Sequence, residues 1–280
     1  MSGDQCTSCV SKGNEECAER QKPLFPPAQN EVSKIKHVLA VFSGKGGVGK
    51  SLVSALIAVG LARRGFRTGI LDADITGPSI PKMFGLRARP EGFDHFIMPV
   101  KTFLGIKVIS LNLLLPEEDD PVIWRGPLIS GAVKQFWTDV VWGEIDYLVV
   151  DLPPGTGDVP LTVMQSLPLN GLVVVTSPQD LVSLVVRKAI KMAGQMNVPV
   201  LGLVENMSYL ECPHCGRKVY LFGRSHVQEI TRSTGIELID CLPVDPRLAE
   251  LSDRGRIEEY QTGAFQGLFE KLGEKLGERW

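Results

Sequence analysis

The sequence predicts an α/β fold with a doubly wound, mostly parallel sheet and helices on both faces. Short runs that are apolar throughout, as in strands buried on both sides, alternate with segments of helical period. A glycine-rich loop joins the first apolar run to the first helix, which is a common feature of such folds. The expected strands are 37–42, 68–72, 106–111, 147–152, 172–176, 200–204 and 237–242, and the expected helices are 52–64, 129–140, 182–196 and 227–233.

Three further segments complete the predicted organisation. Residues 1–34 are polar and interrupted by prolines, so we expect a flexible tail and linker before a single domain at 35–280. Residues 85–105 fit neither strand nor helix period and predict an excursion or hairpin. The apolar positions after Phe265 keep helical period while their polar face mixes both charges, so this helix should pack against the sheet and not bind a membrane.

Net charge and the length of apolar runs indicate which kinds of binding partner to expect. The chain has 30 Lys and Arg against 32 Asp and Glu, a net charge of −2, and it contains no apolar run near the ~18 residues of a membrane span. These features predict neither a nucleic-acid nor a membrane partner. Six cysteines are too few for a disulfide scaffold, and two C-x-x-C pairs favour metal or redox chemistry in the cytoplasm.

The first loop has the phosphate-binding pattern G-x-x-x-x-G-K-[ST], placed between a strand and a helix as the pattern requires. Its glycines allow a tight turn whose N–H groups point inward, and the helix N-terminus favours an anion. Lys50 is predicted to reach the β- and γ-phosphates of ATP, and the Ser51 hydroxyl to join the Mg²⁺ shell. The predicted nucleotide-binding loop consists of Gly44, Lys45, Gly46, Gly47, Val48, Gly49, Lys50 and Ser51.

Polar residues at the carboxyl ends of later strands should face this loop. Asp151 ends an apolar run in the Walker B manner and is expected to hold Mg²⁺. Gly155 is expected to sense the γ-phosphate through its N–H as part of a switch loop, and Asp74 to orient the attacking water. The alternative for each aspartate is a helix cap.

Asn206 ends another strand, where its amide offers both a donor and an acceptor to the adenine edge. An asparagine at a strand end can equally be a turn residue. The loop 243–246 is a weaker candidate for the other side of the base.

A second motif, Cys212-Pro213-His214-Cys215-Gly216, predicts a tight turn that presents two thiolates in one direction. Two thiolates do not complete a tetrahedral site, so a closed four-sulfur site would need one pair from each of two chains. The spacing does not distinguish zinc from an iron–sulfur cluster. The alternatives are a zinc site completed by His214 or Cys241 and a free dithiol; Cys241 itself is expected to be a buried core thiol.

The loop sequence K-G-G-x-G-K-[ST] resembles the deviant P-loop of the ParA, MinD and nitrogenase iron protein class. The resemblance implies that Lys45 reaches across a dimer interface to the partner's nucleotide and that Asn206 contacts the base. Together with Asp72-Ala73-Asp74, Trp124-Arg125-Gly126-Pro127, the Asp151–Asp158 segment, Glu205-Asn206-Met207-Ser208 and the C-x-x-C pair, the chain resembles the Mrp/ApbC family of iron–sulfur P-loop ATPases. This likeness implies a homodimer that binds a [4Fe–4S] cluster through Cys212 and Cys215 of each chain and passes it to apo iron–sulfur proteins, with ATP hydrolysis controlling the dimer.

The tail departs from the family pattern. Eukaryotic relatives carry four N-terminal cysteines with a stable cluster, whereas this chain has three, Cys6, Cys9 and Cys17. The three cysteines could bind a second cluster; the alternatives are a redox-active tail and a tail without a function in cluster binding.

Two other functions compete with the cluster carrier. A ParA- or MinD-like positioning ATPase should have a basic stripe or a cationic terminal helix, and the sequence has neither. An ATP-gated electron-transfer reductase should have its cluster cysteines near the second switch, and residues 76–158 contain no cysteine. The sequence assigns no role to Arg125.

Overall fold

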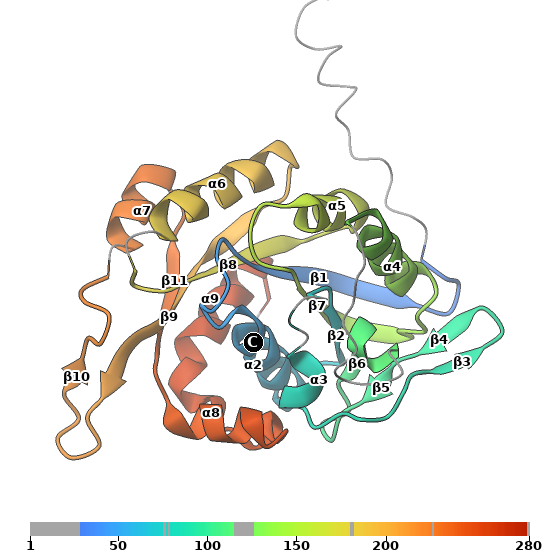
Figure 1. Ribbon diagram of the computed structural model, residues 1–280, viewed down its shortest axis with the longest axis horizontal. Coiled ribbons are helices and arrows are strands. Elements are labelled where there is room, and N and C mark those ends of the chain that lie inside the picture. The colour runs from blue at the N-terminus through green and yellow to red at the C-terminus, as the bar shows by residue number, and fades with distance from the viewer. Residues whose placement is uncertain are drawn as a thin grey trace, which may run out of the picture.

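A nine-stranded sheet forms the centre of the molecule in the computed structural model, which describes residues 29–74, 77, 79–114, 126–179, 182–225 and 227–278 (Figure 1). Cys6, Cys9, Cys17 and Arg125 therefore lie outside the described residues. The strand order is β10-β9-β8-β1-β7-β2-β6-β5, with β11 also paired to β9. All pairs are parallel except β5 with β6 and β10 with β9. The predicted doubly wound, mostly parallel sheet is confirmed.

The strand bounds extend several of the predicted runs. The strands are β1 (Lys34–Ser43), β2 (Thr68–Asp72), β5 (Val100–Lys101), β6 (Lys107–Ser110), β7 (Glu144–Asp151), β8 (Gly171–Thr176), β9 (Val200–Glu211), β10 (Lys218–Val219) and β11 (Leu238–Pro243). β9 continues seven residues beyond the predicted end at 204, since its last residues pair with β10 in a hairpin. The expected excursion at 85–105 contains a separate hairpin, β3 (Glu91–Phe93) and β4 (Phe96–Met98).

Helices cover both faces of the sheet (Figure 1). One face carries α4 (Gly126–Thr138), α5 (Asp158–Ser166), α6 (Val182–Gln195) and α7 (Val227–Thr234). The other carries α2 (Lys50–Arg63), α3 (Ile80–Met83), α8 (Pro246–Asp253) and α9 (Gln266–Leu276). Short 3₁₀ turns lie at Leu111–Leu114, Ile257–Glu259 and Thr262–Phe265.

Each face of the sheet has its own apolar core. In β1, Val38, Ala40 and Phe42 face the first helix layer, while Leu39 and Val41 face the second, as the two-residue period of a strand requires. The C-terminal helix belongs to the second core: a Cβ on Gly60 of α2 would lie 1.9 Å from the ring of Phe269 in α9. This close approach confirms that the terminal helix packs inside the domain.

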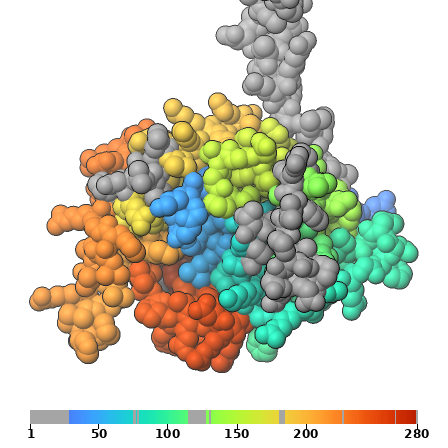
Figure 2. Space-filling model, viewed as in Figure 1, coloured from blue at the N-terminus to red at the C-terminus, as the bar shows by residue number. Residues whose placement is uncertain are grey.

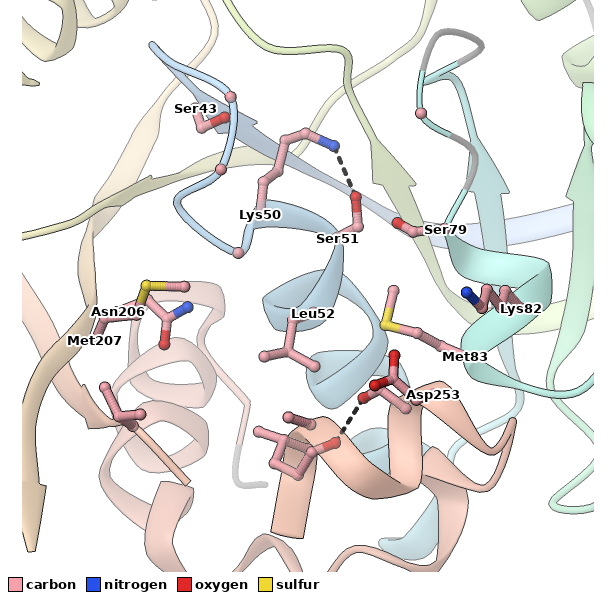
Figure 3. Close-up of a pocket in the computed structure, with 18 of the residues that line it drawn as sticks. Ser43, Lys50, Ser51, Leu52, Ser79, Lys82, Met83, Asn206, Met207 and Asp253 are labelled. Carbon is pink, nitrogen blue, oxygen red and sulfur yellow. Dashed lines mark hydrogen bonds between the residues drawn. The ribbon is translucent and has the colours of Figure 1, made fainter. Parts of the chain in front are cut away.

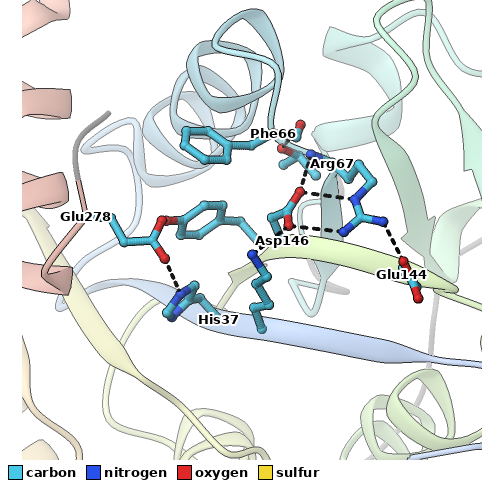
Figure 4. Close-up of polar contacts among 9 residues, drawn as sticks. His37, Phe66, Arg67, Glu144, Asp146 and Glu278 are labelled. Atoms are coloured by element: carbon cyan, nitrogen blue, oxygen red, sulfur yellow. Dashed lines mark hydrogen bonds and ion pairs between the residues drawn. The ribbon is translucent and has the colours of Figure 1, made fainter.

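A polar cluster toward the amino ends of β1 and β7 connects the segment after α9 to the sheet (Figure 4). Tyr147 donates from its hydroxyl to Glu278 (2.5 Å), and Nε2 of His37 lies 2.9 Å from the same carboxylate. Beside it, the guanidinium of Arg67 bonds Asp146 and lowers the pKa of that carboxyl to about 2. These contacts are remote from the glycine-rich loop, which follows the opposite end of β1.

Candidate functional site

The glycine-rich loop forms the turn that the motif predicts. Gly47 and Gly49 have φ of 81° and 79°, in the left-handed region that favours glycine. Gly49 caps α2, and a Cβ there would also lie 2.2 Å from the side-chain nitrogen of Asn206. The loop thus leads into the N-terminus of a 14-residue helix. Helix N-termini bind phosphate favourably through their free N–H groups and the helix dipole.

Lys50 lies among carboxylates at this helix terminus. Its ammonium is 2.9 Å from Asp151 and 3.3 Å from Asp74, and it donates to the Ser51 hydroxyl at 3.1 Å. Burial disfavours the charged ammonium, but the charges of Asp151 and Asp74 outweigh burial and raise the pKa of Lys50. The structure therefore brings together four of the predicted site residues: Lys50 and Ser51 at the start of α2, Asp74 two residues after β2, and Asp151 at the end of β7.

Asp72 belongs to the same cluster, although the sequence analysis assigned it no role. It lies opposite Asp151 in the pairing of β2 with β7 and is 1% exposed. Burial and the neighbouring charge of Asp151 raise its pKa well above the usual range. Its oxygens accept hydrogen bonds from the Ser110 hydroxyl and from the backbone N–H of Asp74, so it positions the loop that carries Asp74.

The cluster has the chemistry of a magnesium site that a nucleotide would complete. Ser54 donates to one oxygen of Asp151 at 2.7 Å, while the other, Oδ2, is buried without a hydrogen-bond partner. Even without a charge on Asp72, the carboxylates of Asp74 and Asp151 against the one ammonium of Lys50 leave excess negative charge, and Mg²⁺ prefers oxygen ligands. Within the described residues no group of three or more His, Cys, Asp or Glu side chains is arranged to hold a metal, so phosphate oxygens and water would supply the remaining ligands.

A pocket of about 650 Å³ opens beside this cluster (Figure 3). Its volume lies within the usual range for small-molecule sites. Asn206 lines it, with its Nδ2 donating to the Val48 carbonyl of the loop at 3.0 Å. This bond fixes the amide so that Oδ1 remains as the acceptor. The residues Pro243, Val244 and Leu248 line the same pocket, next to Asn206 and Met207.

Lys45 and Gly155 have other contacts in this structure. The exposed Lys45 donates to Gln179 at 2.9 Å. The N–H of Gly155 donates to the carbonyl of Ser43 at 2.9 Å, and Gly155 has φ of 87°. Contact of this N–H with a γ-phosphate would therefore require the switch loop to release Ser43.

The C-x-x-C motif forms a tight turn at the end of β9. Cys212 accepts at its carbonyl from Gly216 N–H (2.8 Å) and donates its own N–H to Arg217 (2.9 Å). Backbone N–H groups of His214 and Cys215 point at the Cys212 sulfur and lower the pKa of that thiol. Cys215 is exposed and Cys212 half-buried, so both thiols are near the surface.

No third ligand joins this pair in the part of the chain that the structure describes. The alternative of a zinc site closed within one chain by His214 or Cys241 is therefore not supported. The expectation of a buried core thiol at Cys241 is wrong: the residue is half-buried, and its Sγ lies 3.9 Å from Oε2 of Glu205. None of the described helices is long and apolar enough to cross a membrane.

The glycine-rich loop, the helix that follows it and the carboxylates at the ends of β2 and β7 define a P-loop NTPase. The chain belongs to the family described as ParA: NUBPL iron-transfer P-loop NTPase, whose sequence profile matches residues 34–276. The membership expected from the motifs is thereby confirmed.

Similar proteins agree with this assignment. The chain is 46% identical over 269 residues to an iron–sulfur cluster carrier protein of Clostridium perfringens, covering 91% of this chain and 94% of the relative. It is 51% identical to a nucleotide-binding protein of Archaeoglobus fulgidus solved with ADP and with cobalt present, with a TM-score of 0.74 over 83% of this chain and 91% of the other. The MinC:MinD complex of Aquifex aeolicus is 20% identical with a TM-score of 0.63, over 87% of this chain and 97% of the other, and shows the shared fold alone.

Proposed function

We propose that this protein carries iron–sulfur clusters and delivers them to apo-proteins under the control of ATP. The observation that carries the proposal is the turn at Cys212 and Cys215, which presents two thiols near the surface in a chain of the iron-transfer family. The name of the Clostridium relative supports the same function. Exposed thiols of this kind persist in reducing surroundings, so we propose the cytoplasm as the compartment.

A [4Fe–4S] cluster would need ligands from two copies of the chain. A [4Fe–4S] cluster takes four thiolates, and each described chain brings only Cys212 and Cys215 together. A two-fold axis between two turns supplies the missing pair and makes the cluster a bridge between subunits. Four exposed apolar residues lie shortly after the turn and extend the surface that such a partner would cover: Val219, Tyr220, Leu221 and Phe222.

ATP binds, in this proposal, with its phosphates in the loop from Gly44 to Ser51 and its adenine beside Asn206. Adenine has an amino group that can donate to Oδ1 of Asn206, whereas guanine has an acceptor in that place. Ser51 and Asp151 would hold Mg²⁺, which would supply positive charge next to the phosphates.

Hydrolysis depends on Asp74, which orients water, and on Lys45, which leaves Gln179 to reach the partner's nucleotide. After loss of the γ-phosphate, the N–H of Gly155 again bonds the Ser43 carbonyl. The arrangement of the two subunits then changes, and the cluster becomes accessible for transfer. A second cluster at Cys6, Cys9 and Cys17 stays a prediction.

Transfer to an apo acceptor tests the proposal. The protein is loaded anaerobically with iron and sulfide, and an apo [4Fe–4S] protein is added with Mg·ATP while cluster formation on the acceptor is followed by its circular dichroism. Lys45→Ala should slow ATP hydrolysis by roughly 10²–10³-fold and stop the ATP-dependent part of transfer. Since Lys45 is exposed, the variant should fold normally; Lys134→Ala, an exposed lysine of α4, is the matched control.

Two results would contradict the proposal. A wild-type protein that transfers no cluster would remove the carrier function. Transfer that stays ATP-dependent in Lys45→Ala would remove the role of Lys45.

A further inference from the structure

The cysteine arm, defined here as residues 208–225, projects from the domain at β10 (Figures 1 and 2). It contains the end of β9, the turn with Cys212 and Cys215, and β10, which pairs back onto β9 at Glu211–Lys218 and Leu210–Val219. Ser208 lies in β9 and Ser225 bonds Glu205 of the same strand, so both ends of the arm meet the domain at β9.

One buried carboxylate bonds both ends of the arm. Glu205 is 2% exposed. Its Oε2 accepts from the hydroxyl of Ser208, at the start of the arm, and its Oε1 accepts from the hydroxyl of Ser225, at the end, at 2.5 Å. A buried carboxylate is costly unless its oxygens are hydrogen-bonded, so the position of Glu205 and the closure of the arm depend on each other.

Glu205 is also adjacent in sequence to the nucleotide pocket. The next residue, Asn206, is 3% exposed and bonds the Val48 carbonyl of the P-loop at 3.0 Å. Met207, whose side chain lines the pocket, has φ of 58°, an uncommon value for a residue other than glycine.

The strand is irregular at this point. The register of the pairing shifts here: Cys241 of β11 pairs with Glu205 of β9, and Pro243, two positions later, pairs with Tyr209, four positions later. Strained backbone of this kind persists only where its surroundings hold it, and it is concentrated at sites that change conformation. A continuous strand therefore runs from the P-loop contact, through a distorted segment, to the cysteines.

We infer that Glu205 is a positioning residue that couples the nucleotide pocket to the cysteine arm. A shift of the P-loop on nucleotide binding moves Asn206 through the Val48 contact, and Glu205 moves with it as its neighbour. Because the carboxylate bonds both ends of the arm, this movement shifts the position of the whole arm. The orientation of the two thiols then changes as well. The inference rests on the proposed function in one respect, namely that the arm holds the cluster.

Hydrogen–deuterium exchange on the full-length, metal-free protein tests the coupling without depending on the cluster. Exchange in peptides from the arm is compared with and without Mg·ADP. In the wild type we expect ADP to change exchange in the arm by about fivefold or more, the lower range of measured couplings. Ser225→Ala should lose this change while its affinity for ADP, measured by calorimetry, stays that of the wild type.

Three further variants separate the effect of the hydrogen bond from that of packing. Ser225→Thr retains a hydroxyl and should restore the response of the arm to ADP. Ser233→Ala, which removes a serine hydroxyl that bonds a carbonyl within α7, should respond as the wild type does. Glu205→Gln, which keeps the size of the side chain but not its charge, should weaken the response.

Three results would overturn the inference: an arm in the wild type that does not respond to ADP, a Ser225→Ala arm that responds fully, or a Ser225→Thr arm that fails as alanine does. None of them bears on whether Cys212 and Cys215 bind a cluster, which iron content measures separately.

Discussion

Replacing Lys50 by methionine should destabilise the fold even without nucleotide. The substitution keeps most of the apolar stem and removes the ammonium that lies 2.9 Å from Asp151, whose side chain is fully buried. Breaking a buried pair on one side leaves an uncompensated charge, which costs about 3–5 kcal/mol. That loss is a large fraction of the ~5–15 kcal/mol by which domains are stable.

Urea unfolding followed by tryptophan fluorescence measures this cost. Lys82→Met is the control, because Lys82 lines the same pocket but is exposed, and its loss should change the free energy of unfolding by less than about 0.5 kcal/mol. The double variant Lys50→Met/Asp151→Asn removes both charges and should recover part of the loss. A Lys50→Met protein within about 1 kcal/mol of the wild type would refute the claim that this pair is buried and coupled.

Three other predictions follow from the same structure. Asn206→Ala should weaken ADP binding about tenfold, the value of one hydrogen bond (about 1.4 kcal/mol), as calorimetry would show; unchanged affinity would remove Asn206 from the base site. Phe269→Ala should cost about 3–5 kcal/mol in urea unfolding, whereas Phe103→Ala, 95% exposed, should cost almost nothing; equal costs would contradict the packing of α9. The Tyr147 hydroxyl lowers the pKa of Glu278, so this contact stabilises the fold above the ordinary carboxyl pKa and is lost as pH falls through the lowered value. The stability gap between wild type and Tyr147→Phe should therefore close in acid, and a gap independent of pH would contradict the hydrogen bond.

Local patterns in the sequence were enough to predict the central strands and the position of the phosphate loop. The strand at 68–72 has the predicted bounds, and the phosphate loop lies between the strand and helix that its motif requires. Both depend on short-range features: a continuous apolar run, and glycines where φ must be positive.

Helices with prolines in their first turn were missed. α5 contains Pro160, and α8 begins at Pro246, which the sequence analysis treated as part of a loop. A signal was present for α8, because Asp245 before Pro246 is a cap followed by a proline at the first helical position, and its side chain does accept from the Arg247 N–H.

Contacts between distant segments could not be predicted from pattern. Asp72 gains its role only because β2 lies next to β7, and Glu205 only because Ser225 returns to β9 after the cysteine arm. Cys241 lies in an apolar run, yet it is half-buried and its thiol lies beside the carboxylate of Glu205. Such pairings depend on the register and order of strands, which the sequence specifies only through the complete fold.

Anaerobic reconstitution with iron and sulfide, followed by iron analysis and Mössbauer spectroscopy, shows whether Cys212 and Cys215 of two chains share a cluster. It compares the wild type with Cys212→Ala/Cys215→Ala and, for the tail, with Cys6→Ala/Cys9→Ala. We expect about four irons per dimer, in a [4Fe–4S] spectrum that only the first variant loses. Iron that only the second variant loses would reveal an additional site in the tail. A wild-type dimer that binds no cluster, or a Cys212→Ala/Cys215→Ala protein that keeps the full iron content, would show that these cysteines do not hold a bridging cluster.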